Sequence, residues 1–142
     1  MKRYILLVLA IFAACAETGD EPVKARGEIT EKLEKQKESW NRGDLDGYME
    51  YYLNSNNLTF NAGDRLIRGW DNLARMYRKN YSGREMGVLE FSEVSITVLS
   101  GDASWVTGAW EVQQPDTMRN GRFTLILRKL DGGWRIVHDH SS

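Results

Sequence analysis

Apolar residues recur at helical spacing in three parts of the chain. This period predicts helices over residues 28–41, 45–53 and 70–81, each with polar or charged residues on its other face. The apolar stripes consist of Ile29, Leu33 and Trp40 in the first helix, Leu45, Tyr48, Met49 and Tyr52 in the second, and Trp70, Leu73, Tyr77 and Tyr81 in the third. Gly43 is placed to end the first helix, and Asp44 to cap the second.

Alternation of apolar and polar residues covers the rest of the chain. Residues 58–61 and 65–68 predict a short hairpin around the turn at residues 62–64. The later alternating segments predict four strands, at residues 86–99, 103–113, 120–130 and 134–140. Short turn-forming links make successive strands antiparallel neighbours. The predicted fold class is therefore α+β, with three helices packed on a curved antiparallel sheet.

Strand alternation also predicts which side chains face the helices. The inward-facing set contains Val106, Trp110 and Val112, then Phe123, Leu125 and Leu127, then Trp134 and Ile136. If the alternation continues without a bulge, His138 and His140 point the same way as Ile136. Both imidazoles are then expected on the inner face of the last strand.

The opposite face of the sheet is unusually apolar for a surface turned to water. Its apolar members are Trp105, Ala109, Ile126 and Val137, and its charged residues lie toward the strand ends, at Glu111, Arg122, Arg128, Arg135 and Asp139. An apolar centre with a polar rim is typical of a protein–protein contact. The pattern predicts a homodimer with Trp105 near the centre of the interface.

The N-terminus has the features of an export signal. Lys2 and Arg3 precede an apolar run over residues 4–14, which is too short to span a bilayer as a helix. The run ends at Cys15, and this junction resembles the lipobox of bacterial lipoproteins, in which the cysteine is lipidated. Ordinary signal cleavage after Ala16 is the alternative, because Ala14-Cys15-Ala16 has the A-x-A form. Either interpretation predicts an exported protein, periplasmic or at the cell surface, which contacts a membrane only through a lipid anchor at Cys15.

The remaining chain predicts one domain over residues 24–142, joined to the signal at residues 1–15 by a tether at residues 16–23. Cys15 is the single cysteine, so the domain has neither a disulfide framework nor a thiolate metal site. Without residues 1–14 the formal net charge is about −3, and no run of Lys or Arg is present. Nucleic acid is therefore excluded as a partner on electrostatic grounds.

Several segments of this sequence resemble one known family. They are the helix end Trp40-Asn41-Arg42-Gly43-Asp44, the short apolar hairpin, Gly69 before the third helix, and the closing segment at residues 132–142, which contains Trp134-Arg135-Ile136-Val137-His138-Asp139-His140. Together they resemble the SnoaL-like branch of the nuclear-transport-factor-2-like superfamily, over residues 24–142. The resemblance implies a cone whose open end admits a ligand. The superfamily contains isomerases, cyclases, dehydratases and non-catalytic association modules, so the fold does not define the function.

Steroid isomerases of this superfamily use a carboxylate base opposite a carbonyl group held by Tyr and protonated Asp donors. The resemblance places that base near Asn61, whose amide cannot accept a proton at neutral pH. Asp64 is close in sequence, but a Gly-Asp pair is ordinary in a turn. Steroid isomerisation is therefore disfavoured.

His138 and His140 are the candidate catalytic residues, because imidazoles exchange protons near neutral pH. They are also candidates for closing the cone by hydrogen bonds, whereas a metal site lacks a third ligand and no metal or cofactor is predicted. The candidate ligand pocket is lined by Tyr48, Tyr52, Tyr77, Trp110, His138 and His140. Three functions follow from these residues: binding of a small apolar or aromatic molecule, acid–base catalysis by the histidine pair, or association without catalysis.

Overall fold

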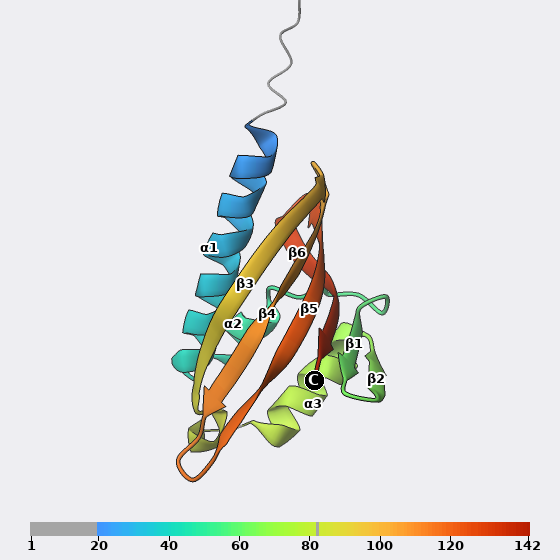
Figure 1. The fold of residues 1–142 in the computed structure, drawn as a ribbon. Coiled ribbons are helices and arrows are strands. Elements are labelled where there is room, and N and C mark those ends of the chain that lie inside the picture. The colour runs from blue at the N-terminus through green and yellow to red at the C-terminus, as the bar shows by residue number, and fades with distance from the viewer. Residues whose placement is uncertain (1–19, 82) are drawn as a thin grey trace, which may run out of the picture.

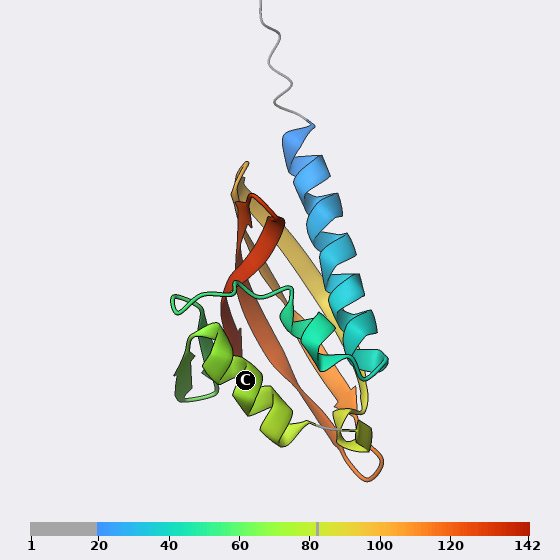
Figure 2. The same cartoon turned by 180° about the vertical axis from the view of Figure 1, so that it is seen from behind.

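Three α-helices lie on one face of a six-stranded sheet in the computed structural model, which describes residues 20–81 and 83–142 (Figures 1 and 2). The helices are α1 (Glu21–Asn41), α2 (Leu45–Met49) and α3 (Trp70–Asn80), with a 3-10 turn at Gly83–Met86. The strands are β1 (Thr59–Ala62), β2 (Arg65–Arg68), β3 (Val88–Ser100), β4 (Ala103–Gln113), β5 (Met118–Leu130) and β6 (Gly133–Ser141). The predicted α+β architecture is confirmed.

Helix α1 runs along β3 and buries one stripe of its surface (Figure 2). Ala25, Ile29, Leu33 and Trp40 are buried along this stripe, as the helical period predicts. The helix begins at Glu21, well before the predicted start, because Pro22 fits the first turn, where its missing N–H costs nothing. Residues 21–23, at the end of the predicted tether, are therefore helical.

Helix α2 is shorter than predicted, since the chain leaves it to pair with the last strand. Asp44 caps its start by accepting a hydrogen bond of 2.8 Å from the Gly47 N–H. Residues 50–53 were predicted as helix, but Tyr52 instead forms a parallel bridge with Ile136 of β6. The backbone N–H of Leu53 donates a hydrogen bond of 2.8 Å to the carbonyl oxygen of Ile136 across this bridge.

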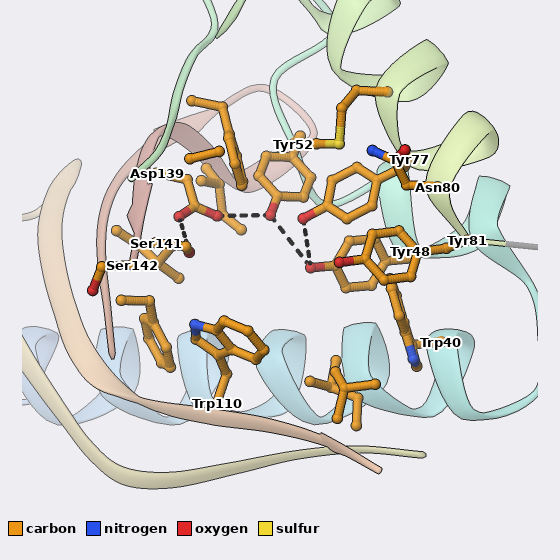
Figure 3. Close-up of a pocket in the computed structure, with 18 of the residues that line it drawn as sticks. Trp40, Tyr48, Tyr52, Tyr77, Asn80, Tyr81, Trp110, Asp139, Ser141 and Ser142 are labelled. Atoms are coloured by element: carbon orange, nitrogen blue, oxygen red, sulfur yellow. Dashed lines mark hydrogen bonds between the residues drawn. The ribbon is translucent and has the colours of Figure 1, made fainter. Parts of the chain in front are cut away.

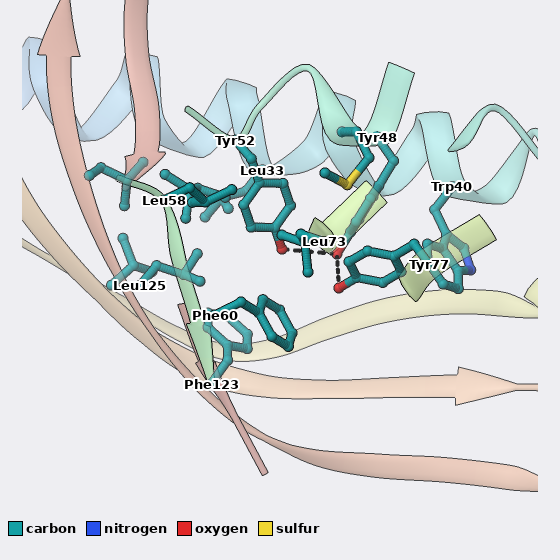
Figure 4. Close-up of a cluster of buried hydrophobic side chains, with 14 of the residues drawn as sticks. Leu33, Trp40, Tyr48, Tyr52, Leu58, Phe60, Leu73, Tyr77, Phe123 and Leu125 are labelled. Atoms are coloured by element: carbon teal, nitrogen blue, oxygen red, sulfur yellow. Dashed lines mark hydrogen bonds between the residues drawn. The ribbon is translucent and has the colours of Figure 1, made fainter. Parts of the chain in front are cut away.

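The strand order in the sheet is β2-β1-β6-β5-β4-β3. Strands β3 to β6 form the predicted antiparallel meander, but β1 pairs with β6 in the parallel direction, so the sheet is mixed. The prediction of a wholly antiparallel sheet was wrong at this one pairing, because the hairpin inserts beside the last strand of the chain. Figure 4 shows the buried cluster between the layers, which contains Leu33 of α1, Leu73 of α3 and Leu125 of β5.

A β-bulge interrupts the alternation of β6. Leu127 of β5 pairs with Ile136, and the residue before it, Ile126, pairs with His138. Val137 therefore has no partner in β5 and is an extra residue in β6. One extra residue reverses the faces of everything that follows it. Asp139 is accordingly buried, with 4% of its surface exposed, whereas His140 is exposed.

Candidate functional site

A cavity of about 710 Å³ lies between the helices and the inner face of the sheet (Figure 3). Its wall on the helix side is aromatic and contains Trp40, Tyr48, Tyr52, Tyr77 and Tyr81. The sheet supplies Phe91, Trp110, Val112, Phe123, Leu125 and Asp139. The ring of Trp40 packs edge-to-face on Tyr48, with 5.1 Å between ring centroids, which helps to fix the tyrosine in place.

The hydroxyl groups of three tyrosines converge inside this cavity (Figure 3). The Tyr48 hydroxyl lies 3.4 Å from that of Tyr52 and 3.4 Å from that of Tyr77. Burial raises the pKa of Tyr48 to about 12 and raises the pKa of Tyr52 and Tyr77 well above the ordinary value. All three phenols therefore keep their protons at neutral pH and can donate hydrogen bonds.

Asp139 is the buried carboxyl group of the cavity. Its Oδ2 atom accepts a hydrogen bond of 2.8 Å from the Tyr52 hydroxyl, and its Oδ1 atom accepts one of 2.7 Å from the Ser141 hydroxyl. Burial raises the pKa of Asp139 to about 6, although these two hydrogen bonds act in the opposite direction. The carboxyl group can therefore gain or lose a proton close to neutral pH.

Trp110 presents an unpaired donor to the same cavity. Its indole Nε1 is the one buried side-chain polar atom without a hydrogen-bond partner in the described part of the chain. Figure 3 shows this nitrogen on the side of the ring that faces Ser141 and Asp139. Gly121 leaves room for it, since a Cβ atom there would lie 2.9 Å from Nε1 and 1.6 Å from the Ser142 carbonyl oxygen. A buried N–H without a partner is costly, so this donor marks a place for an acceptor.

The mouth of the cavity is defined by its solvent-exposed lining residues, which are Gly63, Asp64, Arg65, Asn80, Arg119 and Ser142. They come from the β1–β2 turn, the beginning of β2, the end of α3, the beginning of β5 and the residue after β6. Strand β6 ends at Ser141, which pairs with Phe123, so the first residues of β5 extend beyond it. The cavity therefore opens beside this uncovered part of β5.

The structure places the predicted pocket residues in two groups. Tyr48, Tyr52, Tyr77 and Trp110 line the cavity together, as their strand and helix periods indicated. The prediction that His138 and His140 also line it was wrong, because the bulge at Val137 turns both away from the cavity.

The two histidines occupy the outer face of the sheet instead. His138 pairs with Ile126, and its Nδ1 lies 2.7 Å from the Thr59 hydroxyl. Partial burial, together with the neighbouring His140, lowers the pKa of His138. Neither imidazole reaches the cavity, so neither can act as its acid or base. Asp139, which alternation had placed on the outer rim, occupies the inner position, and no signal in the sequence identified the bulge that moves it.

The apolar patch predicted on the outer face is partly exposed. Trp105 is 48% exposed and Ile126 is 40% exposed, and the two are cross-strand neighbours. Ala109 and Val137 are half-buried.

Cys15, the predicted lipidation site, lies outside the described residues.

Metal ligands do not cluster in the described ranges: no group of three or more His, Cys, Asp or Glu side chains there could hold a metal ion. Within the same ranges, no helix has the length and apolar character needed to cross a membrane. The interior of the cavity carries the carboxyl group of Asp139, the tyrosine hydroxyls and the indole N–H of Trp110.

Comparison with solved structures identifies the fold as NTF2-like, also called cystatin-like. An NTF-2-like protein of unknown function from Shewanella oneidensis is 37% identical over 82% of this chain and 98% of that one, with a TM-score of 0.79. An NTF2-like superfamily protein from Salmonella enterica is 25% identical over 84% of this chain and 91% of that one, with a TM-score of 0.70.

Residues 29–142 match the model of the SnoaL-like domain family, so the chain belongs to that family. A candidate scytalone dehydratase from Novosphingobium aromaticivorans shares the fold at a TM-score of 0.71, with 11% identity over 86% of this chain and 85% of that one. A comparison with curated proteins returned no match.

Proposed function

We propose that the cavity binds a small, largely aromatic molecule whose hydrogen-bond acceptor pairs with the Trp110 indole N–H. The observation that carries this proposal is the unpaired, buried Nε1 atom in the wall of the cavity. A cavity of about 710 Å³ with mainly aromatic walls and a few polar groups is typical of small-molecule sites. An open interior also favours ligand binding over the alternative of a purely associative module.

Two naphthalenes of similar shape test this proposal. 2-Acetylnaphthalene carries a carbonyl acceptor and 2-ethylnaphthalene does not, and each can compete with the fluorescent probe N-phenyl-1-naphthylamine. We expect both to bind, the acetyl compound about five times more tightly, since a neutral hydrogen bond contributes about 1 kcal/mol. Trp110→Phe should abolish this preference while the ethyl compound still binds. The proposal would be overturned if neither compound bound saturably.

A second candidate function is acid–base catalysis by Asp139. The supporting observation is a buried carboxyl group in the cavity wall with a pKa of about 6, close to the pH at which a general acid or base is most effective. Tyr52 and Ser141 hold its two oxygens, which fixes its orientation. This catalyst replaces the histidine pair, whose place on the outer face removes it from the cavity.

The acetyl probe also tests catalysis. A carboxylate base beside a bound methyl ketone removes a proton from the carbon next to the carbonyl, and in D₂O the acetyl methyl group then gains deuterium. We expect NMR to show deuterium exchange above the buffer rate with the native protein and none above it with Asp139→Asn. An exchange rate equal to that of buffer in the native protein would exclude this role.

We propose in addition that the domain acts outside the cytoplasm. The support is the sequence of residues 1–15, which has a positively charged start, an apolar run and a cysteine at the predicted cleavage site. Lipidation of Cys15 would anchor the domain to a membrane surface.

A further inference from the structure

Two arginines at the mouth of the cavity have no acidic partner among the residues that the structure describes. Arg65 of β2 and Arg119 of β5 both line the cavity and are both exposed. Neither forms an ion pair with any carboxylate that the structure describes, and exposed arginines elsewhere, such as Arg68 and Arg75, share this property. Arg65 and Arg119 differ from them in lining the cavity.

Arg119 is of particular interest because it lies on the inward face of its strand. It pairs with Val112 and shares the parity of Phe123, and both of these residues line the cavity. Its single hydrogen bond to a described side chain is one of 3.4 Å with the Tyr81 hydroxyl, a neutral group that leaves the guanidinium charge uncompensated. Guanidinium groups favour carboxylates, phosphates and other anions that present two oxygens to their paired N–H donors.

The charges of the cavity are therefore separated along its length. Among the side chains that the structure describes, the mouth has two cations, Arg65 and Arg119, against one carboxylate, Asp64. The interior has the carboxyl group of Asp139, which repels an anion when ionised, and the neutral donors of Trp110 and the tyrosines.

We infer that the molecule bound here is an amphipathic organic anion. Its aromatic body occupies the interior, its neutral acceptor faces Trp110, and its acidic group stays at the mouth beside Arg65 and Arg119. This inference rests on the proposed binding function and adds the charge and orientation of the ligand.

A pair of fluorescent probes that differ by one acidic group provides the test. 1-Anilinonaphthalene-8-sulfonate has the skeleton of N-phenyl-1-naphthylamine plus a sulfonate. We expect the sulfonate to bind the domain about ten times more tightly, because an arginine–anion pair is charge-assisted and two arginines are present. The double variant Arg65→Gln/Arg119→Gln should remove this preference and leave the affinity of the neutral probe unchanged. The matched control Arg75→Gln, on α3 outside the cavity lining, should preserve it.

The outcomes separate this inference from the function on which it rests. Binding of both probes with equal affinity, or a preference for the sulfonate that survives in the double variant, would overturn the inference and leave the proposed function standing. Failure of both probes to bind would overturn the proposed function itself. Loss of the preference in Arg75→Gln as well would show a general charge effect, and would also overturn the inference.

Discussion

The hydroxyl of Tyr52 donates a hydrogen bond of 2.8 Å to the Oδ2 atom of Asp139, a residue 87 positions further along the chain. The bridge between Tyr52 and Ile136 brings the two segments together, and the bulge at Val137 turns the carboxyl group inward. Both backbone features are therefore needed to place an acid beside a tyrosine in this cavity.

Replacement of Asp139 by Asn should change how stability depends on pH. Because the folded-state pKa of about 6 exceeds the ordinary value of 3.8, the folded protein binds more protons than the unfolded chain between these values. The contribution of this group to the free energy of unfolding therefore falls as the pH rises from about 4 to about 6. Asp139→Asn should remove that fall, which is on the order of 3 kcal/mol for a shift of about two pKa units.

Urea unfolding of the native protein and of Asp139→Asn at pH 4 and pH 7 gives the free energy of unfolding of each. The difference between the two proteins at each pH isolates Asp139, because the contributions of the other carboxylates cancel. Asp116→Asn, in the exposed β4–β5 loop, serves as the control and should behave like the native protein. A stability difference between native and Asp139→Asn protein that is the same at both pH values would contradict the prediction.

Tyr52→Phe should raise the pKa of Asp139 above about 6. Burial is the main cause of the raised pKa, and the Tyr52 hydrogen bond partly offsets it, so removal of the donor leaves the carboxylate less stabilised. Carboxyl ¹³C NMR titration reports this pKa directly. Tyr81→Phe is the control, because this phenol does not hydrogen-bond to Asp139, and it should leave the pKa of Asp139 unchanged. A fall in the pKa of Asp139 in Tyr52→Phe would show that the hydrogen bond is misassigned.

The sequence predicted the elements and most of the pocket because both depend on local periodicity. The stripes of α1 and α3 and the inward faces of β4 and β5 follow unbroken repeats, and these repeats correctly placed Tyr77 and Trp110 in the cavity. The bulge at Val137 depends on how β6 fits between β1 and β5, which no pattern within residues 134–140 reveals. This one unpredicted bulge places Asp139 in the cavity wall, where alternation had placed His138 and His140.

Single cysteines test the faces of β6 directly. A domain without residues 1–15 contains no native cysteine, so His140→Cys and Asp139→Cys each carry a single thiol. We expect the thiol at position 140 to react rapidly with 5,5′-dithiobis(2-nitrobenzoate), and the thiol at position 139 to react at least tenfold more slowly, because it is buried. The reverse order would mean that the alternation of β6 is uninterrupted.

The export proposal predicts a specific effect of Cys15→Ala. Expressed in a bacterial host, the native precursor should fractionate with membranes and dissolve in detergent, because a lipidated Cys15 anchors it. Cys15→Ala should release the protein or leave it unprocessed. A mature N-terminus at Glu17, found by mass spectrometry, would show ordinary signal cleavage in place of lipidation.

The outer face of the sheet leads to the last prediction, a homodimer with Trp105 near its centre. Trp105 and Ile126 together expose an apolar surface, and charged residues such as Glu111 and Arg122 stand toward the strand ends. Trp105→Glu should dissociate this dimer, since an unpaired carboxylate buried in the interface costs several kcal/mol.

Val23→Glu is the matched control, because Val23 is also apolar, is 65% exposed, and lies on α1, which covers the opposite face of the sheet from Trp105. Sedimentation equilibrium of the domain without residues 1–15 should give a dimer for the native protein and for Val23→Glu, and a monomer for Trp105→Glu. His138 shares the outer face and its pKa is lowered, so its protonation in acidic solution should also weaken the dimer, by bringing like charges together. A native protein that sediments as a monomer at tens of micromolar would rule out the interface.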